Sequence, residues 1–229
     1  MNCCGADAFD RAERQKAREQ TRDVIAEFKR IVREEAAGSH GEAEAFRRLE
    51  SGIVPRMSAR DRAGDLVTRA WSTSGARRYK MAEEALALWA DCAEAYLILG
   101  ERAEYEHESV EMYERGVEAG RRALGEKFFE TEVGRFGALV AARPYLRVRS
   151  ALATSLWHIG REDEAVQHLL EILRLDESDL EASRRILLVI LLSCGEVDRV
   201  DDLLARFPDD RSAMWLYGGA LHHLRQKRE

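Results

Sequence analysis

Two stretches near the end of the chain share one residue pattern at a fixed spacing, and this spacing restricts the possible folds more than any other feature. Each stretch, 149–179 and 182–210, reads as a helix, a turn with one glycine, a second helix and an acidic turn. The residues that match across an offset of 35 positions are Gly160 with Gly195, Ala165 with Val200, and Leu169 with Leu204. A repeat of this kind predicts helical hairpins that stack side by side.

A period of 34–35 residues with small and large apolar residues at fixed offsets is typical of tetratricopeptide repeats. The small residue of each helix sits where the two helices cross, a place taken here by Ala153 and Ala165. Larger apolar residues fill the space beside them: Leu152, Leu156, Leu169, Ile172 and Leu173. Related units are readable earlier, in ALALWADCAEAYLILGE (85–101), and in the last helix, with Trp215, Tyr217 and Gly219. We therefore expect an all-α fold, a tetratricopeptide-like solenoid of helical hairpins with a right-handed α–α superhelix.

The composition supports an all-α fold. The chain has three prolines and a single asparagine, Asn2, so it lacks the turn residues that a series of β-hairpins requires. Gly116 and Gly120 fall inside a predicted helix over 106–124. Because glycine lowers helix propensity, we interpret this pair as a site where neighbouring helices pack closely.

We predict two domains. Residues 1–58 form a charged N-terminal helix, about 9–37, and a short helical extension around 42–50. Residues 59–229 form the tetratricopeptide-like repeat domain, which ends in a capping helix. Its first helix is expected over 59–71, directly after Ser58.

The net charge and the short apolar runs argue against two classes of partner, nucleic acids and membranes. The formal net charge is −6 and the pI about 5.7, so the chain lacks the basic character of most nucleic-acid-binding proteins. A weaker hypothesis assigns nucleic-acid contacts to the basic residues of the first helix: Arg11, Arg14, Lys16, Arg18 and Arg22. The longest apolar run, Ile186–Leu192, spans roughly 10 Å as a helix, too short for a bilayer. It predicts a buried core helix, and no membrane partner is expected.

The cysteines indicate a reducing compartment. The chain has four cysteines and no CxxC motif, so neither a disulfide scaffold nor a zinc module is predicted. Cys92 and Cys194 are expected to be small buried apolar residues, and any role of Cys3 and Cys4 stays open. No signal peptide is readable at the N-terminus, and we expect a cytoplasmic location.

Several segments between residues 60 and 225 go beyond the generic repeat. The most specific are GVEAGRRALGE (116–126) and RPYLRVR (143–149), accompanied by DLVTRAW (65–71), ALALWADCAEAYLILGE (85–101) and GRFGALVAA (134–142). In these segments the chain resembles bacterial tetratricopeptide proteins classed with the suppression-of-tumorigenicity protein family. That resemblance implies a helical repeat fold, in a family without an established activity. The chain departs from the family pattern at Phe136, near which the family has a tryptophan, and at DESDLEA (176–182), in place of an Asn-Asp-Asn-Gln-like turn.

The candidate binding residues follow from the repeat. In a tetratricopeptide stack the first helix of each hairpin lines the concave face, which binds peptides. The candidate peptide-binding residues are Arg143, Tyr145, Arg147, Thr154, Trp157, His158, Arg185 and Val189. Guanidinium groups bind carboxylates through two hydrogen bonds, so an acidic peptide suits this face. The alternative is that these arginines pair with acidic residues of the chain itself and stack on neighbouring aromatic rings.

No pattern in the chain requires catalysis. The motifs GxGxxG, GxxxxGK[ST], HExxH and GxSxG are absent, and adjacent His222 and His223 point about 100° apart on a helix, so no metal or cofactor is predicted. We expect a non-enzymatic scaffold or adaptor that binds a peptide or partner helix on the concave face. The alternative is a small-molecule sensor or enzyme with its site at the junction around Phe136, Arg143 and Tyr145. The partner, the cellular process and self-association as a homo-oligomer stay open.

Overall fold

The computed structural model describes residues 26, 30 and 57–227 of the chain. The chain divides into two units, residues 1–62 and 63–229, and nearly all of the described residues belong to the second. Apart from Ala26 and Arg30, the predicted N-terminal helices and the basic residues of the first helix lie outside the described residues, as do Cys3 and Cys4.

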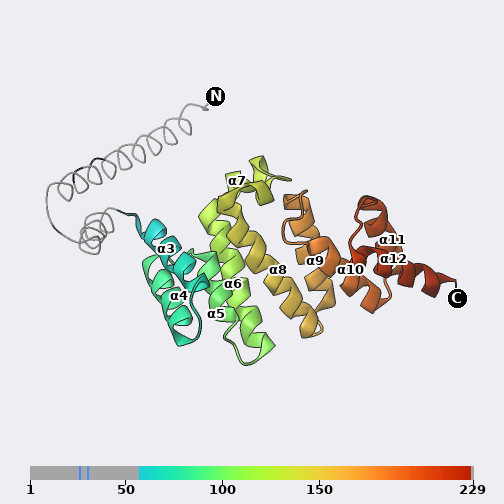
Figure 1. Cartoon of the computed structure of the whole chain (residues 1–229), viewed down its shortest axis with the longest axis horizontal. Helices are drawn as coiled ribbons and strands as arrows, with labels where there is room; N and C mark the ends of the chain where they lie inside the picture. The colour runs from blue at the N-terminus through green and yellow to red at the C-terminus, as the bar shows by residue number, and fades with distance from the viewer. Residues whose placement is uncertain (1–25, 27–29, 31–56, 228–229) are drawn as a thin grey trace. The chain divides into compact units, whose positions relative to one another are not determined.

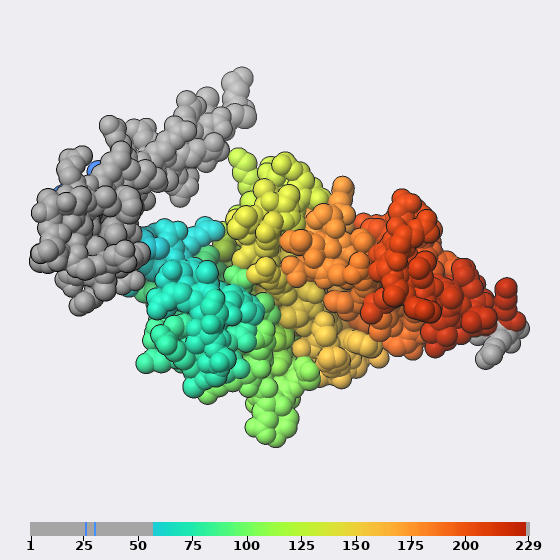
Figure 2. Space-filling model, in the orientation of Figure 1, coloured from blue at the N-terminus to red at the C-terminus, as the bar shows by residue number. Residues whose placement is uncertain are grey.

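Over the described residues the fold is all-α: ten α-helices pack in sequential pairs, without a sheet. In chain order they are α3 (Ala59–Trp71), α4 (Ala76–Leu88), α5 (Ala93–Gly100), α6 (Glu106–Leu124), α7 (Glu126–Thr131), α8 (Arg143–His158), α9 (Glu162–Leu175), α10 (Ser183–Cys194), α11 (Val197–Arg206) and α12 (Ala213–Gln226). Two short 3-10 helices, Phe136–Ala138 and Val140–Ala142, lead into α8. Most helices of this unit pack on the next helix in chain order, and α6 also packs on α8, past the short α7 (Figures 1 and 2).

The helix ends follow from local side-chain chemistry. Ser58 caps α3, since its Oγ accepts a hydrogen bond from the backbone N–H of Asp61 at 3.1 Å. Ser212 caps α12 in the same way, with the N–H of Trp215 as donor at 3.4 Å. The spans predicted for α3 and α6 are confirmed.

The two glycines that defined the repeat end two equivalent helices. Gly160 follows α8 with φ 79°, and Gly195 follows α10 with φ 74°, a left-handed conformation that favours glycine. In the first turn the carbonyl of Leu156 accepts from the N–H of Arg161 at 2.8 Å. In the second, the carbonyl of Leu191 accepts from the N–H of Glu196 at 3.1 Å. These hydrogen bonds repeat the offset of 35 residues, so α8–α9 and α10–α11 are built as equivalent hairpins.

The predicted core positions of the repeat 149–179 are buried, but of those predicted in the last helix Tyr217 is 77% exposed, while Trp215 is buried. Ala153 and Ala165 have no exposed surface, and the five predicted filling residues are at most 1% exposed. The run Ile186–Leu192 forms most of α10, where its buried members are Leu187, Leu188, Ile190 and Leu191. Cys92 is buried as expected. The prediction for Cys194 was wrong: it is exposed, because it is the last residue of α10, where the chain turns toward α11.

Gly116 and Gly120 are packing sites, as predicted. A Cβ atom at Gly116 would lie 2.7 Å from Cγ2 of Val148 on α8 and 2.9 Å from Cβ of Tyr96 on α5. A Cβ atom at Gly120 would lie 3.1 Å from Cδ2 of Tyr145. The absence of side chains on this face of α6 therefore lets three helices approach closely.

The segment between α6 and α8 interrupts the repeat with an aromatic cluster. Phe136 has no exposed surface, and its ring meets those of Phe128 and Phe129 edge-on, with both centroid distances at 5.2 Å. The neighbouring Gly137 faces the carboxylate of Asp176, which a Cβ atom would approach to 2.5 Å. The segment therefore packs against the turn that follows α9.

The turn 176–182, with the sequence DESDLEA, is held together by hydrogen bonds to two of its own carboxylates. Asp176 is 1% exposed, and its carboxylate accepts hydrogen bonds from the N–H and Oγ of Ser178 and from the N–H of Leu180. The carboxylate of Asp179 accepts from the N–H of Ser183 at 2.6 Å, at the start of α10. These carboxylates hold the turn and satisfy the backbone N–H groups at a helix start.

The glycines allow a matched test of this packing. We expect Gly116→Ala to lower the free energy of unfolding by about 1–3 kcal/mol, because the new methyl group overlaps Val148 and Tyr96. Gly64→Ala on α3 should instead raise the free energy of unfolding by up to about 1 kcal/mol, since no described atom lies within 4 Å of its Cβ position. Urea unfolding of both variants measures the difference. Equal stability of the two variants would show that α6 does not pack as described.

Candidate functional site

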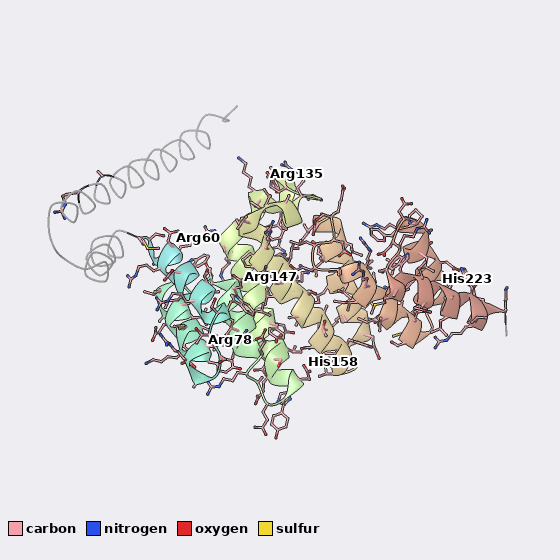
Figure 3. The ribbon with its side chains drawn as sticks, in the orientation of Figure 1. Arg60, Arg78, Arg135, Arg147, His158 and His223 are labelled. Atoms are coloured by element: carbon pink, nitrogen blue, oxygen red, sulfur yellow. The ribbon has the colours of Figure 1, made fainter. Side chains whose placement is uncertain are left out.

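Six of the eight predicted binding residues lie on α8. Arg143 and Tyr145, at its start, belong to the packed junction, and the other four follow along the helix. Arg147 belongs to its first half and His158 is its last residue (Figure 3). Thr154 and Trp157 lie between them and are partly exposed. The structure thus places these four side chains on one helix, where they remain accessible to solvent to different degrees.

Arg147 is engaged by carboxylates from two other segments. Its Nη1 donates to Oε1 of Glu94 on α5 at 2.6 Å, and its Nε lies 3.7 Å from Oε1 of Glu181, just before α10. The guanidinium group therefore links the start of α5 to the residues just before α10. These two are the first helices of the hairpins on either side of α8–α9. The side chain is 43% exposed, so solvent weakens these ion pairs.

Arg185 and Val189 lie on α10, both partly buried. Nε of Arg185 is 3.8 Å from Oδ2 of Asp210, which also accepts a hydrogen bond from Nε of Arg184 at 2.7 Å. Burial alone would raise the pKa of Asp210, but hydrogen bonds from Ser212 and Arg184 outweigh it and lower the pKa to about 2. Asp210 is thus an anion that neutralises the basic residues at the start of α10.

Thr154 and His158 border a polar hollow between α8 and the turn after α5. The hollow has a volume of about 460 Å³ and carries three acidic residues, Glu101, Glu104 and Glu106. Nδ1 of His158 lies 3.1 Å from Oε1 of Glu106. Oγ1 of Thr154 donates to the carbonyl of Ser150. This end of the predicted site is therefore acidic rather than basic.

Arg143, Tyr145 and Phe136 are part of the packed junction. Tyr145 is 1% exposed and Phe136 is fully buried, and their rings belong to the same edge-to-face cluster. Burial raises the pKa of Tyr145, whose hydroxyl accepts a hydrogen bond from Arg149. Nε of Arg143 donates to the carbonyl of Gly137 at 3.1 Å. Phe136 and Tyr145 are thus part of the core at this junction, while Arg143 stays partly exposed.

Sequence reasoning missed the acidic partners and one apolar surface. Glu94 and Asp210 lie close to two of the three predicted arginines, Arg147 and Arg185, from distant positions in the chain, which repeat spacing alone does not reveal. The solvent-facing side of α12 is almost wholly apolar. That feature was visible in the sequence, because AMWLYGGALHHL has apolar residues on every side of the helix.

The described residues contain no group of three or more His, Cys, Asp or Glu side chains arranged to hold a metal ion. None of their helices is both long enough and apolar enough to cross a bilayer. No protein-family model matches the chain, and no curated protein or solved structure matches it at a significant level.

His168 on α9 is a titratable group with an unusual environment. It is partly buried, and its Nδ1 has no hydrogen-bond partner. Burial lowers the pKa of His168 to about 4, with further repulsion from Arg149 and Arg161 and a smaller opposing attraction from Glu164. The imidazole is therefore neutral in the folded protein at neutral pH.

This environment makes stability depend on pH. An unfolded histidine takes up a proton near pH 6.5, whereas folded His168 does so only near pH 4, so the free energy of unfolding falls as pH drops through this window. Between pH 7.5 and pH 5 we expect the wild type to lose roughly 1 kcal/mol more than His168→Gln, a value reduced for partial solvent exposure. Urea unfolding at both pH values measures this difference. Exposed His107 gives the control, as His107→Gln should keep the wild-type pH response. An unchanged response in His168→Gln would contradict the assignment.

Proposed function

We propose that this chain is a non-enzymatic interaction protein with tetratricopeptide-like repeats, which binds a peptide or partner helix across the first helices of its last hairpins. The proposed docking surface comprises Arg147, Thr154, Trp157 and His158 of α8, and Arg185, Val189 and Leu192 of α10. Thr154 and Val189 are 35 residues apart, and so are Trp157 and Leu192. Equivalent positions on neighbouring hairpins belong to the same side of the stack.

One observation carries the proposal: partly exposed apolar side chains sit at equivalent positions on consecutive first helices. Trp157 on α8 and Val189 and Leu192 on α10 are each only partly buried. Trp157 and Leu192 pack against the core with part of their surface, and Leu192 also lies beside Gly218 of α12, which leaves only the remainder of each side chain for a partner. Aromatic and aliphatic side chains of this kind are the usual anchors of helix-in-groove recognition. Such a surface offers binding without catalytic groups.

The arginines have a different role in this proposal from the one that the sequence suggested. Arg147 lies close to Glu94 and Glu181, and Arg185 lies close to Asp210. An acidic partner must displace these carboxylates before it can bind the guanidinium groups, which offsets much of the gain. We therefore expect apolar contacts to dominate affinity, with the arginines at the edge of the contact.

Two sets of substitutions separate these contributions. We expect Val189→Asp to reduce the amount of a co-purifying partner at least about tenfold, because it places a carboxylate in an apolar contact. The charge reversal Arg147→Glu with Arg185→Glu should have a smaller effect. The measurement is quantitative mass spectrometry of proteins recovered with each variant from the native host.

Leu170→Asp provides the control for this experiment, as Leu170 is 41% exposed on α9, a second helix. It should leave recovery unchanged, and circular dichroism should show that every variant is folded. If Val189→Asp and Leu170→Asp give the same recovery, the docking surface is not where we place it. A larger loss from the double charge reversal would favour recognition of an acidic partner.

A further inference from the structure

The last described helix, α12, packs through one side only. On that side a Cβ atom at Gly218 would lie 2.8 Å from Cδ2 of Leu188 on α10, and one at Gly219 would lie 3.7 Å from Cδ1 of Leu204 on α11. Trp215 and His222 are buried there, and Nε2 of His222 lies 2.8 Å from Oδ1 of Asp201. Through this side, α12 thus packs on both α10 and α11.

The opposite side of α12 is apolar and exposed. Its large side chains are Met214 at 49% exposure, Leu216 at 53%, Tyr217 at 77%, Leu221 at 44% and Leu224 at 60%. The exposed small residues Ala213 and Ala220 lie between them. A folded protein rarely leaves a whole helix side of this kind in water unless another surface covers it.

The other hairpins show what covers the corresponding helices. The first helix α8 packs against α9, and α10 packs against α11. Their apolar residues Ala153, Leu156, Leu187 and Leu191 are at most 2% exposed as a result. Within the described part of the chain, no such second helix covers the exposed side of α12.

We propose that this side of α12 binds the same side of α12 in a second copy of the chain, with the two helices antiparallel. The sizes of the side chains favour this pairing. A twofold axis between positions 218 and 219 places Ala213 opposite Leu224 of the other copy, and Ala220 opposite Tyr217. Each large side chain of the central stripe thus meets a small one, so the surface is complementary to itself.

The charges at the ends of α12 fit the same arrangement. The last turn carries His223 and Arg225, and Lys227 follows it, whereas the segment before the helix carries Asp209, Asp210 and Arg211, with one net negative charge. Antiparallel pairing brings the basic end of each helix beside the acidic segment of the other copy. Lys227 and Asp209 are both exposed, and neither takes part in an ion pair within the described residues. The helix dipoles are also opposed in this geometry, which is favourable.

The oligomeric state of the full chain tests the proposal. Sedimentation-velocity ultracentrifugation should show a concentration-dependent dimer for the wild type. Tyr217→Glu combined with Leu224→Glu should raise the dissociation constant at least about tenfold, since carboxylates would be buried against apolar groups. Both sites are largely exposed in the single chain, so the variant should fold normally. Leu170→Glu, at an exposed apolar site on α9, should leave the dimer unchanged.

The outcomes separate the second copy from other occupants of this surface. A wild-type chain that stays monomeric at all concentrations would overturn the proposal and point to a different protein or to another segment of the same chain. A dimer that survives Tyr217→Glu with Leu224→Glu would equally overturn it. Neither result depends on recovery of a partner by the α8–α10 docking surface, so the two proposals can fail separately.

Cysteine cross-linking tests the antiparallel arrangement itself. In a background with Cys3, Cys4 and Cys194 replaced by serine, Ala213→Cys combined with Leu224→Cys should give a disulfide-linked dimer on mild oxidation. Neither single substitution should do so, because equal positions at the helix ends lie roughly 16 Å apart in the antiparallel pair. Cross-linking by Ala213→Cys alone would indicate parallel helices and contradict the proposed geometry.

Discussion

The close approach of neighbouring helices through small residues is the constraint on which the rest of this structure depends. Gly116 and Gly120 let α6 lie directly against α5 and α8. Ala153 and Ala165 do the same between α8 and α9, where neither has exposed surface. Because the helices come so close, the larger apolar residues beside them pack without reaching solvent. The helices from α5 to α12 thus share one core, and α3 and α4 form a second one with the other side of α5.

The same packing determines which surfaces remain available. A helix within the stack contacts its neighbours over most of its surface and exposes only a narrow side to solvent. Trp157 lies on this side of α8, and Val189 lies on this side of α10. A helix at the end of the described stack, α12, keeps about half of its circumference in solvent. The two surfaces that we propose as binding sites are therefore those that the packing leaves exposed: the narrow sides of α8 and α10, and the open side of α12.

Much of the fold was predictable because its determinants are local. The offset of 35 residues between Gly160 and Gly195 predicted two equivalent hairpins, and both glycines adopt the same left-handed turn. Ser58 marked the start of α3, and the glycine pair in α6 marked a close contact. The site was less predictable, since Arg147 pairs with Glu94, 53 positions away, and Tyr145 is packed by Phe129 and Phe136 from a segment that does not follow the repeat. Cys194 shows the same limit: its apolar character predicted burial, but its place at a helix end exposes it.

Photo-crosslinking in the native host tests most directly whether the exposed sides of the first helices are docking surfaces. A photoreactive amino acid would be placed at Val189 or Tyr217, and at Leu170 on the second helix α9 as the comparison. If both proposed docking surfaces are occupied, position 217 should give cross-links to a second copy of the chain and position 189 to a partner protein, with few cross-links from position 170. Cross-links that arise mainly from position 170, or equally from all three, would contradict this account.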